Sequence, residues 1–336
     1  MENTLPFGVT VYGICVALAA LVAVLLLYAQ LRAEARRTVG RGAIGCIGHV
    51  QPLRLAVFCI PAAFVGARLL FCLVRFGFFF VELGPLSVLN TRTGGFLLYG
   101  AVLGAMLAAA AVARHDGVRV ATALDDLAAP GMLAILICRL AEGTTGEGVG
   151  AWVENEALWR FPIAVQNEFG EWQYAVFMLE ALIAAVLLIV LLTRRYAPGE
   201  RIMTALLLYA CCQVVCESLR MDSCPRVGFV RVSQVISAVA ILGVTVVRAL
   251  RAGGTRQAAL RSVIMLACAG VVGGIEWALD KTPIDNRILY LVMAAACAAM
   301  AVNGSRFTKP MRRDKGENGD GEVRLSAQRE NLLPGR

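Results

Sequence analysis

An arginine and two glutamates stand close together where a long apolar segment of the sequence ends. The stretch LAILICRLAEGTTGEGVG, residues 133–150, contains Arg139, Glu142 and Glu147 with glycines between and after them. Arg139 and Glu142 are three residues apart, so they can form a salt bridge if the helix continues. A guanidinium group beside exposed backbone N–H groups is suited to bind a phosphate, and the carboxylates could orient the arginine or handle a proton. We interpret this stretch as a functional site.

A second group of polar side chains interrupts another apolar segment, LYACCQVVCESLRMD. Tyr209, Gln213 and Glu217 are spaced by four residues and therefore share one helix face. Glu217 is predicted to pair with Arg220, three residues on. A polar stripe on a membrane helix must face protein or water, because lipid cannot satisfy it. The stripe is either part of a site or a hydrogen-bonding seam between helices.

Two further residues could do chemistry or could serve the structure. Arg68, in VGARLL, either functions at a site or anchors its helix at the membrane surface. Tyr99, in TGGFLLYGAVLG, is either a site residue or a member of the aromatic belt at the interface. Gly100 and Gly104 have the GxxxG spacing that allows two helices to approach closely.

Long helices must position these residues. Hydrophobic residues make up 58% of the 336-residue chain and charged residues 17%, which is more apolar than a soluble domain. The apolar residues are clustered in runs long enough to cross a membrane. We predict an all-α polytopic transmembrane helix bundle of about nine spans, at 8–30, 53–74, 94–113, 121–140, 174–192, 202–219, 232–249, 258–278 and 287–302.

The net charge of +8 reflects the membrane topology of the chain and does not indicate a nucleic-acid partner. Lys and Arg gather in the first polar loop, 31–54, in alternate loops after it, and in the C-terminal segment. The positive-inside rule then predicts an extracytoplasmic N-terminus and a cytoplasmic C-terminus. The polar segment 304–336 is predicted to be a disordered cytoplasmic tail.

Several classes of site are excluded by the residues present. Both histidines, His49 and His115, fall in predicted cytoplasmic loops, so no histidine-based triad can form at the outer face. The sequence has no Walker loop, dinucleotide fingerprint or zinc motif. Cys212 and Cys216 are one helical turn apart but lack further ligands, so neither a metal nor another cofactor is expected. Only Cys224 lies in a predicted outer loop, and no disulfide framework follows.

Four segments, in this order, resemble the bacterial prolipoprotein diacylglyceryl transferases. They are VTVYGI in the first span, GARLLF with Arg68, GGFLLYGAVLG with Tyr99, and DDLAAPGMLAILICRLAEGTTGEGVG with Arg139. The resemblance covers about 1–250 and implies a seven-helix transferase-like membrane domain there. Residues 251–303 are then predicted to form two additional transmembrane helices, with 304–336 as the tail.

The resemblance implies a reaction and its substrates. Proteins of that family transfer the diacylglyceryl group of phosphatidylglycerol to the thiol of a lipobox cysteine in a prolipoprotein, forming a thioether and releasing glycerol phosphate. The expected partners are phosphatidylglycerol, prolipoprotein signal peptides and membrane lipid. The expected location is the bacterial cytoplasmic (inner) membrane, where the protein would act in lipoprotein maturation.

The resemblance also implies site residues. Arg139 matches the family's phosphatidylglycerol-binding arginine, and Gly146 and Glu147 match the end of its Asn-Gly-Glu segment. Catalytic roles are expected for Tyr99, Glu147, Tyr209 and Glu217, and substrate-binding roles for Arg68, Arg139, Glu142, Gly146, Gln213 and Arg220.

The sequence departs from the family pattern at three places. Tyr99 replaces the signature histidine, and Gln213 replaces an arginine of the sixth span. Ala175 and Val176 stand where the fifth span of the family has Tyr-Glu, so an acid is expected to be missing.

These departures leave several hypotheses open. Glu147 or Glu217 takes the thiol proton, or the chain is a diverged member with weak, altered or no transferase activity. One alternative is an accessory membrane protein that binds phospholipid or a precursor. A transporter or channel is disfavoured, because no internal repeat is present and the polar residues cluster toward the outer half.

Overall fold

The computed structural model describes residues 4–5, 9–39, 49–90, 94–222, 225–228, 230–252, 256–282 and 285–305. Within these residues, nine helices are long and apolar enough to cross a membrane. The predicted fold class, an all-α polytopic membrane protein, is confirmed. The helices are α1 Val11–Val39, α2 Pro52–Val74, α3 Leu98–His115, α4 Val120–Glu142, α5 Val176–Thr193, α6 Glu200–Leu219, α7 Val232–Arg251, α8 Arg256–Lys281 and α9 Asn286–Ser305. The predicted tail lies outside the described residues except for 304–305, which end α9.

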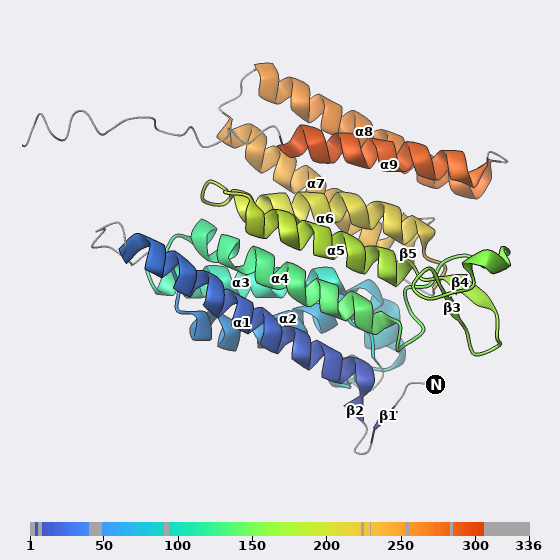
Figure 1. Cartoon of the computed structure of the whole chain (residues 1–336), viewed down its shortest axis with the longest axis horizontal. Coiled ribbons are helices and arrows are strands. Elements are labelled where there is room, and N and C mark those ends of the chain that lie inside the picture. Colours follow the sequence, from blue (N-terminus) through green and yellow to red (C-terminus); the bar gives the residue numbers. More distant parts are fainter. Residues whose placement is uncertain are drawn as a thin grey trace, which may run out of the picture.

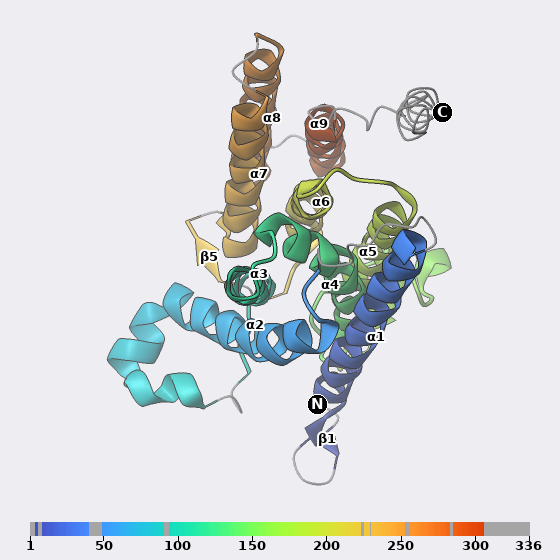
Figure 2. The same cartoon turned by 90° about the vertical axis from the view of Figure 1, so that its left-hand side faces the viewer.

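Three short antiparallel β-hairpins lie at one end of the bundle, on the right in Figure 1. We call this the hairpin end. The pairs are β1 Thr4–Leu5 with β2 Val9–Thr10, β3 Ala164–Gln166 with β4 Trp172–Tyr174, and β5 Arg226–Val227 with β6 Val230–Arg231. The connections between helices also contain short helical turns: η2 Gly77–Glu82, η3 Pro85–Leu89 and η5 Glu156–Leu158. Figure 2 shows the segment with η2 and η3 turning away from the bundle after α2.

Two helix boundaries differ from the predicted ones for identifiable reasons. Helix α1 continues nine residues past the predicted end of the first span at 30. Residues 31–39 include Leu, Ala, Arg and Glu, which favour a helix, and the charged ones are too polar for the membrane interior. Helix α3 begins at Leu98, because Gly94 and Gly95 adopt φ of 65° and 84°, outside the helical region.

The close crossing predicted from the GxxxG spacing is confirmed between α2 and α3. A Cβ on Gly104 would lie 2.1 Å from the carbonyl oxygen of Ala62, and one on Gly100 would lie 2.4 Å from that of Gly66. The two backbones therefore touch where Figure 2 shows α2 passing α3. Any larger residue at these positions would push the helices apart.

The last two helices share an apolar core with α6 and α7. Leu207 and Val214 of α6 pack with Met265 of α8 and with Met293 and Met300 of α9. Figure 1 shows α8 and α9 side by side along α6 and α7. The predicted extra pair of spans is thus a packed part of the bundle rather than a separate unit.

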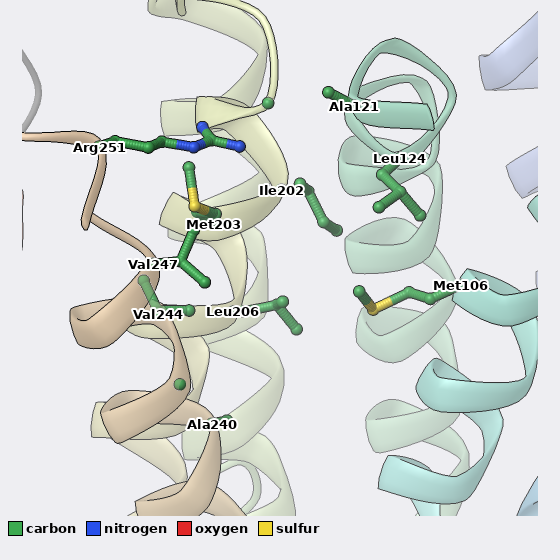
Figure 3. A pocket seen from close by; sticks show the side chains of 12 residues that line it. Met106, Ala121, Leu124, Ile202, Met203, Leu206, Ala240, Val244, Val247 and Arg251 are labelled. Carbon is green, nitrogen blue, oxygen red and sulfur yellow. The ribbon is translucent and has the colours of Figure 1, made fainter. Parts of the chain in front are cut away.

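A cavity of about 340 Å³ lies between α3 and α4 on one side and α6 and α7 on the other. Figure 3 shows apolar side chains such as Met106, Leu124 and Leu206 pointing toward it, with Arg251 at one end. Arg251 closes α7 at the end of that helix away from the hairpins, and its Nη1 lies 3.3 Å from Glu200 Oε1.

Candidate active site

Arg139 is the centre of a buried group of charged side chains at the hairpin end. It lies in the last turn of α4, and only 7% of it is exposed. Its Nη1 donates to Glu142 Oε1, as the i, i+3 spacing predicts, and its Nη2 donates to the Tyr209 hydroxyl at 3.2 Å. Its Nε lies 3.1 Å from Glu180 Oε2, yet the angle does not make a hydrogen bond. Among the described residues, that buried N–H has no acceptor.

Glu180 corrects one expectation from the sequence. The fifth span was expected to have lost an acid at the positions of Ala175 and Val176, but α5 supplies one a turn further along. Glu180 is 2% exposed and reaches Arg139 and Arg220. The sequence does carry a signal for Glu180, because an ionisable residue within an otherwise apolar span is a functional candidate by default.

Arg220 binds three acids, but not the one predicted. Its Nη1 lies 3.2 Å from Glu180 Oε2 and 3.4 Å from Glu142 Oε2, and its Nη2 lies 2.6 Å from Asp222 Oδ2. The predicted pair with Glu217 is wrong. Helix α6 ends one residue earlier and Arg220 is extended, with φ −77° and ψ 139°, so its side chain leaves the helix face that Glu217 occupies.

The polar stripe of α6 forms as predicted. Tyr209, Gln213 and Glu217 are all buried. Gln213 Nε2 donates to Glu217 Oε1 at 2.9 Å and to Glu180 Oε1 at 3.1 Å. The Gln213 amide therefore links an acid of α6 to an acid of α5.

Arg231 and Asp222 complete the group and were missed from the sequence. Arg231 Nη1 lies 2.8 Å from Asp222 Oδ1 and 3.4 Å from Glu217 Oε2, and its Nη2 donates to the Arg220 carbonyl at 2.5 Å. Burial would raise the pKa of Asp222, but hydrogen bonds and charges from Arg220 and Arg231, with the Gly148 N–H, lower it to about 2. Asp222 is therefore a carboxylate at neutral pH.

This buried group, which we call the charge cluster, holds one more carboxyl than guanidinium group. Burying so many charges is costly unless they are paired and hydrogen-bonded, and each of them is. Because the cluster has four carboxylates for three guanidinium groups, protonation of one carboxylate would still leave one carboxylate for each arginine. Its members are Arg139, Arg220 and Arg231 with Glu142, Glu180, Glu217 and Asp222.

The glycines after α4 allow the following loop to pack tightly on the cluster. Gly146 and Gly148 have φ of 74° and 73°, a region that favours glycine. A Cβ on Gly148 would lie 2.7 Å from Glu142 Oε2 and 2.8 Å from Phe177 Cβ. Glu147, between them, is exposed and lies outside the charge cluster.

Arg68 is not brought to the charge cluster. It is 4% exposed, and its guanidinium donates to carbonyls of the segment between α2 and α3. The acceptors include Asn90 at 2.7 Å, Val88 at 3.0 Å and Gly95 at 3.1 Å. Arg68 was expected either to function at a site or to anchor its helix at the membrane surface. The geometry favours anchoring, but the anchored segment is the loop between α2 and α3.

Tyr99 faces the inside of the bundle. Its hydroxyl forms a hydrogen bond with Ser237 Oγ of α7, a residue with no exposed surface. The aromatic-belt interpretation requires the hydroxyl to face the membrane surface, so this geometry argues against it.

The sequence comparison identifies the family. A family model described as prolipoprotein diacylglyceryl transferase matches residues 2–250. The chain belongs to the prolipoprotein diacylglyceryl transferase family. All members of the charge cluster lie within the matched region, whereas α8 and α9 lie beyond it.

Similar proteins named phosphatidylglycerol–prolipoprotein diacylglyceryl transferase occur in several bacteria. The one from Clostridium kluyveri is 27% identical over 244 residues, which cover 70% of this chain and 89% of the relative. That from Enterococcus faecalis is 31% identical over 202 residues, covering 57% and 72%. That from Bacillus licheniformis is 29% identical over 246 residues, covering 70% and 86%.

The structure sorts the sequence-predicted residues of this family member into two sets. One set lies together at the charge cluster: Arg139, Glu142, Tyr209, Gln213, Glu217 and Arg220. The other set lies apart from the cluster contacts: Arg68, Tyr99, Gly146 and Glu147.

Proposed function

We propose that this chain transfers the diacylglyceryl group of phosphatidylglycerol to the lipobox cysteine of prolipoproteins in the bacterial cytoplasmic membrane, with the hairpin end facing outward. Membership of the transferase family supports this function. The observation that carries it is the buried Arg139, whose guanidinium is fixed by Glu142 and Tyr209 at the hairpin end. We further propose that 1–250 forms the transferase domain and that 251–303 adds two helices to it.

The reaction places separate demands on a site. The cysteine sulfur forms a bond to the glyceryl carbon that carries the phosphate, and the carbon–oxygen bond breaks. The electron pair leaves with the phosphate oxygen, so the products are a thioether, glycerol phosphate and the proton of the thiol. A thiol with pKa near 8.5 must lose that proton before it attacks.

Arg139 is suited to hold the phosphate. Each terminal guanidinium nitrogen carries two hydrogens, and each makes one hydrogen bond, to Glu142 or to Tyr209. A second N–H on each nitrogen allows a two-point contact with phosphate oxygens. Because Glu142 and Tyr209 already fix the guanidinium, it need not reorganise as charge builds on the leaving phosphate. Arg220 supplies further positive charge beside it.

Glu217 is the carboxylate best placed to receive the thiol proton. Glu142, Glu180 and Asp222 each contact two arginines. Glu217 has Arg231 alone, at 3.4 Å, and the neutral amide of Gln213. It is therefore the acid of the cluster with the fewest arginine contacts.

The remaining candidates have supporting roles in this proposal. Tyr209 orients Arg139, Gln213 orients Glu217, and Gly146 lets the loop fold over the donor lipid. Glu147 is the competing base, and comparing Glu217→Gln with Glu147→Gln separates the two: loss of turnover in only the first variant supports Glu217. Arg68 holds the segment between α2 and α3, and Tyr99 links α3 to Ser237 of α7.

The deciding experiment uses the purified full chain with a lipobox peptide and phosphatidylglycerol labelled in its glycerol head group. We expect labelled glycerol phosphate, and release about a hundredfold slower or more with Arg139→Ala, because a fixed charge on the leaving group is lost. A peptide with serine in place of the lipobox cysteine is the matched control and should give no release. Lipid binding through Arg139 without release would overturn the transferase and indicate the accessory protein.

A further inference from the structure

The carboxyl group of Glu276, in helix α8, lies next to the charge cluster. Glu276 Oε1 accepts a hydrogen bond from Gln234 Nε2 at 2.6 Å and another from the Ser218 hydroxyl. Ser218 is in the last turn of α6 and Gln234 in the first turn of α7, so Glu276 bridges the two helix ends that carry Glu217 and Arg231. Glu276 lies beyond residue 250, where the family match ends.

Gln234 links Glu276 to the backbone of Arg231 through hydrogen bonds. Its Oε1 accepts from the Arg231 N–H at 3.0 Å, which caps the start of α7. Its Nε2 donates to Glu276, to Ser218 at 2.8 Å and to the Val214 carbonyl at 3.3 Å. With both amide hydrogens held, the carbonyl end must point at Arg231. Without Glu276, the amide would lose a charge-assisted partner that fixes this orientation.

Arg231 in turn holds the loop that presents Arg220. Its guanidinium contacts the Asp222 carboxylate at 2.8 Å, and it donates to the backbone carbonyls of Arg220 at 2.5 Å and Asp222 at 3.1 Å. A continuous chain of contacts therefore leads from Glu276 through Gln234 and Arg231 to Arg220, which faces Glu142 and Glu180.

Helix α9 fixes the same corner from its other side. The Tyr290 hydroxyl donates to the Ser218 carbonyl at 3.2 Å, and the Met293 sulfur lies 3.3 Å from Ser218 Oγ. At the end of the α8–α9 pair that lies away from the β-hairpins, Arg248 of α7 donates to the Gly304 carbonyl at 2.8 Å. The α8–α9 pair is thus attached along its length, and Glu276 has a defined position.

We infer that the α8–α9 pair is a working part of the transferase site, in which Glu276 is a positioning residue that holds Arg231 and Arg220 in place through Gln234 and Ser218. The inference rests on the proposed function. It assigns a role to helices that lie outside the family match. Glu276 acts on the geometry of the cluster and does not itself touch the reacting atoms.

The test measures kcat and KM for phosphatidylglycerol in the full chain, below the melting temperature of every variant. Glu276→Leu should lower kcat about tenfold to a hundredfold, because a small displacement at a distance can cost that much, with little change in KM. Glu276→Gln keeps an acceptor oxygen and should stay within about fivefold of the parent chain. Ile275→Ala, which removes only apolar packing from the neighbouring position, is the matched control and should keep its kcat.

A double-mutant cycle tests the route through Gln234. If Glu276 acts through it, adding Glu276→Leu to Gln234→Ala should cost little more. Equal rates for Glu276→Leu and the parent chain, or equal losses in Glu276→Leu and Ile275→Ala, would overturn the inference, and so would additive losses in the cycle. A parent chain that releases no glycerol phosphate would instead overturn the proposed function.

Discussion

At the scale of single residues, the site is defined by how many partners each charged group has. Arg139 is held by Glu142, Glu180 and Tyr209, which a lysine could not reproduce, because only a planar guanidinium offers donors in fixed directions. The Tyr99 hydroxyl forms a hydrogen bond with Ser237 Oγ. Arg139 is thus fixed by several polar partners, whereas Tyr99 presents a phenol hydroxyl inside the bundle.

This difference leads to a prediction for Tyr99→His. A free imidazole with pKa near 6.5 accepts protons at neutral pH, whereas a free phenol with pKa near 10 does not. We expect the variant to raise the initial rate of glycerol phosphate release by about tenfold or more, within the range of general base catalysis. Ser237→Ala, which removes the hydroxyl partner without adding a base, is the control. An unchanged rate in Tyr99→His would show that Tyr99 is structural.

At the scale of the elements, the site depends on where helices end and how closely they approach. The charge cluster joins the end of α4, the start of α5, the end of α6 and the start of α7, so its residues come from helix termini at the hairpin end. Arg220 reaches its acids only because α6 stops before it. Elsewhere, α2 and α3 approach to backbone contact, and the carbonyls that follow α2 are held by Arg68.

Gly104→Ala tests the α2–α3 approach. The new Cβ would lie 2.1 Å from a backbone oxygen of Ala62, so one helix must move. We expect a loss of about 1–3 kcal/mol in the free energy of unfolding, as for overpacking in general. Thermal unfolding in detergent measures it. Gly270→Ala in α8 meets no atom within 4 Å and should be neutral, and equal stability of the two variants would contradict the contact.

At the scale of the whole molecule, polar groups tie the bundle together at both ends. Far from the charge cluster, His49 Nδ1 lies 2.8 Å from Asp126 Oδ2 of α4, and its Nε2 lies 3.3 Å from Glu34 Oε2 of α1. The hydrogen bond to Asp126 raises the pKa of His49, although partial burial opposes this. Between the two ends, α3, α4, α6 and α7 line the apolar cavity of Figure 3.

The His49 contacts predict a pH dependence of stability. Because the pKa is raised on folding, the stabilisation is complete below the ordinary value of 6.5 and is lost as the pH rises through the higher folded value. The melting temperature should therefore fall as the pH rises above about 6.5 in the parent chain, and His49→Asn should flatten this slope. His115→Asn is the control, since that side chain is 77% exposed. A slope that persists in His49→Asn would refute the assignment.

The sequence alone determined the nine helices, the capacity of α3 for a close helix approach at Gly100 and Gly104, and the polar stripe of α6. A bilayer demands long apolar runs, and contacts within one helix follow from its period. Only the tertiary structure decided which charges meet. Arg220 contacts acids 40 and 78 residues earlier, Glu180 and Glu142, and α6 ends before Arg220 instead of carrying it toward Glu217. No local spacing determines which turn of one helix faces which turn of another, because packing of the whole bundle sets that register.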